Sequence, residues 1–165
     1  MTPDRRRRLQ QEIRQAQPFR SRTQEAFLSL LRTADVAKRQ FTELFEEHGL
    51  TFQQYNVLRI LRGAGDEGLP TLEIGERMIE RQPGVTRMID RLVKKGLALR
   101  DRGVKDRRRV WCRITPAGLE LLEALDAPVD KTDKAVFAGL TEEEVDHLLE
   151  LLDSMRAKVL ENTEN

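Results

Sequence analysis

The chain has few of the residues that disulfides and metal sites require. It contains one cysteine, Cys112, and two histidines, His48 and His147, scattered along 165 residues. A single cysteine cannot form an internal disulfide, and these three residues match no Cys/His ligand spacing. We therefore expect no structural metal and no cofactor.

Long apolar runs are absent as well. No stretch approaches the roughly 18 to 20 apolar residues of a membrane-spanning helix, and no apolar segment follows the basic start as in a signal peptide. The chain also lacks a Gly-rich phosphate loop, paired histidines and a base close to Cys112 in sequence. These absences argue against an enzyme and predict a cytoplasmic protein without a membrane partner.

Positive charge is concentrated in one segment of the chain. The 29 basic and 28 acidic residues nearly balance, but residues 81–113 hold twelve basic residues and three acidic ones. Residues 115–165 instead hold four basic and thirteen acidic residues. A polyanion is the expected partner of the basic segment, whereas the acidic segment is unsuited to binding phosphate groups.

The capping residues of several helices predict where those helices begin. Thr51 and Thr141 each begin a capping box, and Thr115-Pro116 puts a proline at the first helical position. Apolar residues at helical spacing predict a long helix through residues 27–45 and another through residues 55–61. These signals set most of the helix boundaries that we expect.

The basic segment is expected to form a helix and a β-hairpin. A short helix near residues 72–79 precedes a second one from Pro83 to Lys95, which Gly96 ends. Two short runs, residues 97–100 and 110–114, flank a glycine-containing turn and predict the hairpin. Helices followed by a hairpin in this order are typical of a winged helix-turn-helix domain, whose second helix enters the major groove.

The last third of the chain predicts two amphipathic helices with a kink at Pro128. Their apolar stripes, like that of the first long helix, need a partner surface, most simply a second copy of the chain. The fold class is thus mainly α with a small β-hairpin. We assign residues 1–20 to a basic arm, 21–48 and 115–161 to dimerisation helices, and 49–114 to the winged helix domain.

Four segments together resemble the MarR family of bacterial transcription regulators. They are LEIGERM (72–78), GVTRMIDRLVKKGL (84–97), DRR (106–108) and RITPAGLELL (113–122), and they keep the family's order and spacing. The resemblance extends over residues 19–160. It departs in the hairpin, where the family often has Asp-Pro before the acidic residue and this chain has Gly103-Val104-Lys105.

The resemblance implies a homodimer with interleaved terminal helices on a pseudo-palindromic DNA operator. It further implies regulation of transcription as a repressor or an activator, most simply a repressor. Release is expected by a small-molecule effector of phenolic or lipophilic character, or by an oxidant. An alternative is a winged helix scaffold that binds protein or RNA without operator specificity. A steep salt dependence together with a preference for one duplex distinguishes the two.

The DNA-binding residues are expected at two places. The start of the helix at Pro83 combines side chains that can pair with adenine, guanine and the thymine methyl group. In the hairpin turn, the resemblance makes Arg108 the contact at the tip, held by Asp106, with its neighbours on phosphates. The full set is Gln82, Pro83, Gly84, Thr86, Arg87, Arg91, Lys105, Asp106, Arg107, Arg108 and Arg109.

Three further features of the sequence each have two interpretations. His48, Tyr55 and Arg59 are candidate effector contacts, although Tyr55 can also be a packing partner of Leu50 at the helix start. Cys112 on an inward strand face is expected to be a buried hydrophobe rather than an oxidant sensor. The run Arg5 to Arg8 is either a DNA-binding arm or a frayed terminus.

Overall fold

A computed structural model describes residues 8–80, 83–102 and 110–162. The chain divides into two compact units, Met1–Phe52 and Gln53–Asn165. Within the described residues, no helix has an apolar stretch long enough to cross a bilayer.

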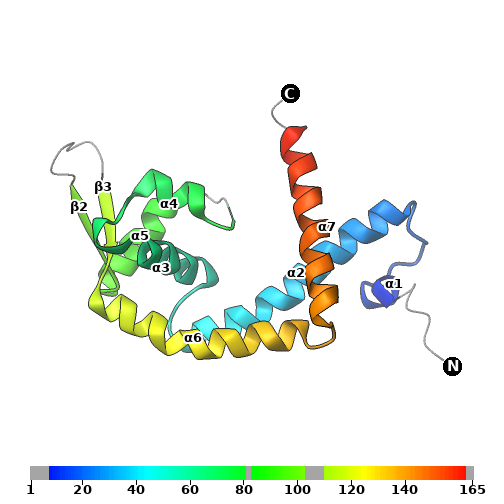
Figure 1. The fold of residues 1–165 in the computed structure, drawn as a ribbon, viewed down its shortest axis with the longest axis horizontal. Coiled ribbons are helices and arrows are strands. Elements are labelled where there is room, and N and C mark those ends of the chain that lie inside the picture. The colour runs from blue at the N-terminus through cyan, green and yellow to red at the C-terminus, as the bar shows by residue number, and fades with distance from the viewer. Residues whose placement is uncertain (1–7, 81–82, 103–109, 163–165) are drawn as a thin grey trace. The chain divides into compact units, whose positions relative to one another are not determined.

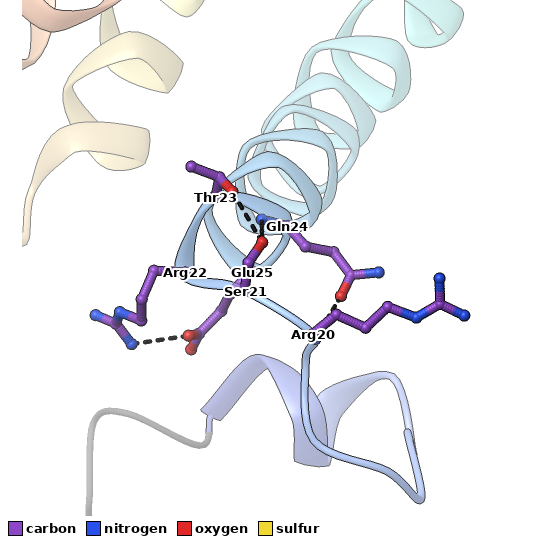
Figure 2. Close-up of polar contacts among 6 residues, drawn as sticks. All are labelled: Arg20, Ser21, Arg22, Thr23, Gln24 and Glu25. Carbon is purple, nitrogen blue, oxygen red and sulfur yellow. Dashed lines mark hydrogen bonds and ion pairs between the residues drawn. The ribbon is translucent and has the colours of Figure 1, made fainter.

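The first unit contains α1 (Arg8–Glu12) and the long helix α2 (Arg22–Glu47). Figure 2 shows the start of α2, where Ser21 Oγ accepts a hydrogen bond from the Gln24 amide at 3.1 Å and the Gln24 side chain accepts one from the Arg20 amide at 2.7 Å. Arg22 and Glu25 add an ion pair at 2.8 Å. These bonds satisfy amides that the first helical turn leaves unpaired.

An aromatic cluster lies near the end of α2. The ring of Phe45 lies 6.2 Å from that of Phe41 and 5.9 Å from that of Phe52, and Lys38 Nζ is 5.4 Å from the Phe52 ring centre. Gly49, with φ of 70°, ends the helix. Its left-handed conformation lets the Leu50 amide bond to the Phe45 carbonyl at 2.8 Å, as in a Schellman motif.

The second unit has a small helical core beside a sheet (Figure 1). Its elements are α3 (Phe52–Ala64), the 3₁₀ turn Gly65–Glu67, β1 (Leu69–Pro70), α4 (Thr71–Arg77), α5 (Val85–Lys94), β2 (Ala98–Arg102), β3 (Val110–Ile114), α6 (Pro116–Phe137) and α7 (Glu142–Glu161). Fully buried side chains from α3, α4, α5 and α6 form the core, among them Leu58, Ile74, Leu92 and Leu122. This is the mainly helical fold that the sequence predicts.

The sheet has three antiparallel strands rather than the two of the expected hairpin. β3 lies in the centre, with Leu69 of β1 opposite Cys112 and Arg100 of β2 opposite the same residue on the other side. Gly68 makes the approach of β1 possible, because a Cβ there would lie 2.3 Å from the Cys112 carbonyl oxygen.

One helix boundary differs from expectation. We expected a helix from Pro83, but α5 begins at Val85, because Gly84 has a left-handed φ of 100° that cannot belong to a helix. Pro128, where we expected a kink, lies inside α6, which continues from Pro116 to Phe137. The caps at Thr115 and Thr141 are confirmed, each threonine accepting the amide three residues on.

Candidate nucleic-acid interface

Helix α5 has an apolar inner face and a basic outer face. Ile89 and Leu92 are fully buried, whereas Thr86, Arg87 and Arg91 are exposed. The two sets alternate at helical spacing, so burying the apolar residues necessarily turns the basic ones outward. The helix therefore presents hydrogen-bonding and cationic side chains to a polyanion.

Short-range contacts fix both ends of α5. At the start of the helix, Val85 lies beside Gly75 of α4, where a Cβ would be 3.5 Å from the Val85 side chain, an ordinary van der Waals distance. At the other end Gly96, with φ of 72°, lets the Leu97 amide bond to the Leu92 carbonyl at 3.0 Å. Gly96 thus ends the helix as expected.

The hairpin is tied to α5 by an ion pair. Arg100 on β2 donates to Asp90 on α5, and Arg113 on β3 pairs with Asp101 at 3.3 Å. We predicted no role for Arg100 and Asp90 beyond their charge, since nothing local shows that residues ten apart will meet. The Arg100–Asp90 pair connects the hairpin to the helix that carries the outer basic face, whereas the Arg113–Asp101 pair joins the two strands of the hairpin.

The structure describes only part of the predicted DNA-binding set. Pro83, Gly84, Thr86, Arg87 and Arg91 lie at the start and on the outer face of α5, and all five are exposed. The remaining predicted residues lie outside the described part of the chain: Gln82, Lys105, Asp106, Arg107, Arg108 and Arg109.

A cavity of about 730 Å³ lies between α4, the start of α5 and the hairpin. Its wall includes Leu72 and Arg77 of α4, Thr86 of α5 and Arg100 of β2. This volume is in the range of small-molecule sites. Arg100 gives the cavity a cation that already has a carboxylate partner, Asp90.

The three predicted effector contacts do not line this cavity. His48 ends α2, where its Nδ1 lies 3.0 Å from the Leu44 carbonyl oxygen. Tyr55 is buried, and burial raises the pKa of its hydroxyl while Arg59 and Arg62 oppose that shift. Arg59 is exposed on α3.

Cys112 lies fully buried in the central strand. Burial raises the pKa of its thiol, with a smaller opposite effect from the hydrogen bond to Thr71 at 3.5 Å. A thiol that is both inaccessible and protonated is poorly suited to react with oxidants. The position therefore favours the buried-hydrophobe interpretation.

A basic outward helix beside a small antiparallel sheet defines a winged helix DNA-binding protein. The model of the MarR family matches residues 50–110. A MarR transcription factor from Planctomyces limnophilus is 42% identical, with a TM-score of 0.65, over 82% of this chain and 98% of that one. The chain belongs to the MarR family.

Two further proteins resemble the chain at lower identity. The homoprotocatechuate degradative operon repressor of Escherichia coli is 25% identical over 130 residues, which are 79% of this chain and 86% of that protein. A mutant of MarR from E. coli, solved in complex with operator DNA, is 26% identical with a TM-score of 0.70, covering 76% of this chain and 89% of that one. The protein is a DNA-binding transcriptional regulator, and the prediction of a regulator rather than an enzyme is confirmed by this family.

Proposed function

We propose that the protein is a cytoplasmic repressor that binds a pseudo-palindromic operator as a homodimer and is released by a small molecule. The observation that carries the proposal is the outer face of α5. Thr86, Arg87 and Arg91 project from the exposed side of this helix. Its inner face is buried, its C-terminal end is closed by a hydrogen bond, and an ion pair joins it to β2. A rigid basic helix of this kind suits the major groove, where arginine pairs with guanine through two hydrogen bonds.

Apolar side chains on the terminal helices support the homodimer. Phe27 on α2 is 57% exposed, and Leu149 and Val159 on α7 are 54% and 64% exposed. Exposed large apolar side chains that recur along helices mark an association surface, and a two-fold pair covers the same surface on both copies. We assign residues 21–48 and 115–161 to this association and residues 49–114 to DNA.

The hairpin turn supplies the second DNA contact in this proposal. Arg108 reaches the DNA beside the major groove and Asp106 holds it, while Lys105, Arg107 and Arg109 meet phosphates. We expect Arg108→Ala to weaken operator binding by about 1 to 3 kcal/mol in a folded dimer. Unchanged operator affinity at the same salt would remove Arg108 from the interface.

The effector is proposed to be a phenolic or lipophilic small molecule. His48, Tyr55 and Arg59 remain predicted contacts, and the cavity beside Thr86 and Arg100 offers a second location. An anionic group in that cavity would compete with Asp90 for Arg100 and so loosen the hairpin from α5. Titrating phenols and aromatic acids into the protein–operator complex, with Arg100→Gln and Tyr55→Phe as paired variants, locates the effector.

The decisive experiment compares duplexes from upstream of the protein's own coding region with a random duplex at two salt concentrations. A repressor of the proposed kind prefers one upstream duplex, and its affinity falls steeply with salt. Equal, weak affinity for every duplex would instead support the scaffold alternative. Sedimentation of the same preparation measures the dimer directly.

A further inference from the structure

Two polar side chains of α3 lie where the core would otherwise be apolar. Gln54 and Asn56 are 4% and 5% exposed, and they are flanked by the fully buried Val57 and Leu58. Burying an amide side chain is unfavourable unless it forms hydrogen bonds. The hydrogen-bond partners of these two side chains therefore indicate their structural role.

Asn56 holds the chain where it leaves α4. Its Oδ1 accepts a hydrogen bond from the Ile79 backbone amide at 3.1 Å. Ile79 follows Met78, the extended residue that ends α4, and comes six positions before Val85, where α5 begins. Beside it, Gln53 Nε2 donates to Glu80 Oε2 at 3.3 Å.

Gln54 contacts the opposite end of α5. Its Oε1 accepts a hydrogen bond from Nζ of Lys95, the residue that ends the helix, at 3.4 Å. Side chains from the first two turns of α3 thus reach the turn before α5 and the residue that closes it. Helix α3 therefore bonds to the chain on both sides of α5.

The bond to Ile79 matters because side-chain burial does not fix this turn. Ile79 is 67% exposed, and Pro83 and Gly84 are exposed as well. The Asn56 bond joins the backbone of this turn directly to a side chain of another helix. Without it, the start of α5 gains freedom while the buried residues Ile89 and Leu92 stay packed.

We propose that Asn56 is a positioning residue for sequence reading. By holding Ile79, it sets where Thr86 and Arg87 meet the base edges, and this role rests on the proposed function of operator recognition. Paired hydrogen bonds to a base demand accurate placement, whereas charge attraction to phosphates tolerates displacement. Loss of the Asn56 bond therefore lowers discrimination between duplexes more than it lowers affinity for DNA in general.

The test measures the ratio of affinities for operator and random duplex at one salt concentration. Asn56→Leu keeps the branched shape of the side chain but has no acceptor, and Asn56→Ala removes the acceptor without adding bulk. We expect either variant to lower the ratio about tenfold, because the discrimination that one paired side chain–base contact supplies is of that order. The salt slope stays unchanged, because no phosphate contact is lost.

Two controls separate positioning from plain destabilisation. Val57→Ala removes a fully buried side chain from the same helix but no hydrogen-bond acceptor, so its unfolding temperature falls while its ratio stays at the wild-type value. Asn56→Asp keeps an acceptor for the Ile79 amide and restores most of the ratio.

The inference is wrong if the folded Asn56 variants discriminate as well as the wild type, or if Val57→Ala loses discrimination equally. A wild-type protein without any duplex preference overturns the proposed function itself. The duplex preference of the wild type is measured without any variant. Failure of the proposed function can therefore be distinguished from failure of the inference about Asn56.

Discussion

Gly118 in the first turn of α6 is a position where a single added methyl group should be damaging. Its amide donates to Thr115 Oγ1 at 3.0 Å. A Cβ at this residue would lie 2.4 Å from the Leu97 carbonyl oxygen and 2.7 Å from Ile114 Cγ1. Both distances are far inside van der Waals contact, so Gly118→Ala requires atoms to move.

Two opposite effects decide the size of the change. Alanine in place of glycine within a helix contributes about 1 kcal/mol through backbone entropy. Against this, overpacking a buried site costs about 1 to 3 kcal/mol. The Leu97 carbonyl cannot retreat freely, because it accepts the Thr115 amide at 3.2 Å. The two effects together leave a net loss of up to about 2 kcal/mol in the free energy of unfolding.

Gly63→Ala is the matched control for this prediction. Gly63 lies in α3, and a Cβ there would meet no atom within 4 Å. The entropic gain should then appear alone, at about 0.5 to 1 kcal/mol. Urea unfolding followed by circular dichroism, at one protein concentration, measures both variants. Gly118→Ala that gains as much stability as Gly63→Ala would refute the close contact with Leu97.

Three other predictions concern the cap, the thiol and the DNA. Thr115→Ala removes a hydroxyl that caps α6 and donates to the Gly96 carbonyl at 2.7 Å, so urea unfolding should show a loss of about 1 to 2 kcal/mol in the free energy of unfolding. A loss below about 0.3 kcal/mol, which is close to the error of the method, would contradict this. Because burial raises the pKa of Cys112 above its ordinary 9.0, the thiol's contribution to stability is complete below pH 9 and is lost as the pH rises through the raised value. Cys112→Ala should therefore lose less stability than the wild type between about pH 8 and 10, and parallel curves would argue against the raised pKa. Arg87→Ala should weaken operator binding by about 1 to 3 kcal/mol and random duplex binding by less, as fluorescence anisotropy can measure; equal losses would make Arg87 a phosphate contact.

The features that sequence could predict are those decided by neighbouring residues. Thr115 and Thr141 each cap a helix by accepting a hydrogen bond from the amide three residues later, and Gly96 ends α5 through its left-handed conformation. Each of these features depends on only a few consecutive residues. The basic outer face of α5 follows from helical spacing in the same way. Local rules fail at Pro83, where a proline that favours a helix start is followed by Gly84 in a left-handed conformation.

The missed features depend on residues far apart in the chain. Strand β1 has two residues and no periodicity of its own, and it exists because Leu69 pairs with Cys112. The bonds from Asn56 to Ile79 and from Asp90 to Arg100 likewise join different elements. The residues around Asn56 in the sequence show neither that its side chain is buried nor which group it binds.

The hydroxyl of Thr115 joins two helices of the second unit. It accepts the Gly118 amide at the start of α6 and donates to the Gly96 carbonyl just after α5, so a single side chain links the start of one helix to the end of the other. With 22 residues, α6 is about 33 Å long. A displacement of about 3 Å at its Phe137 end therefore corresponds to a rotation of only about 5° about Thr115.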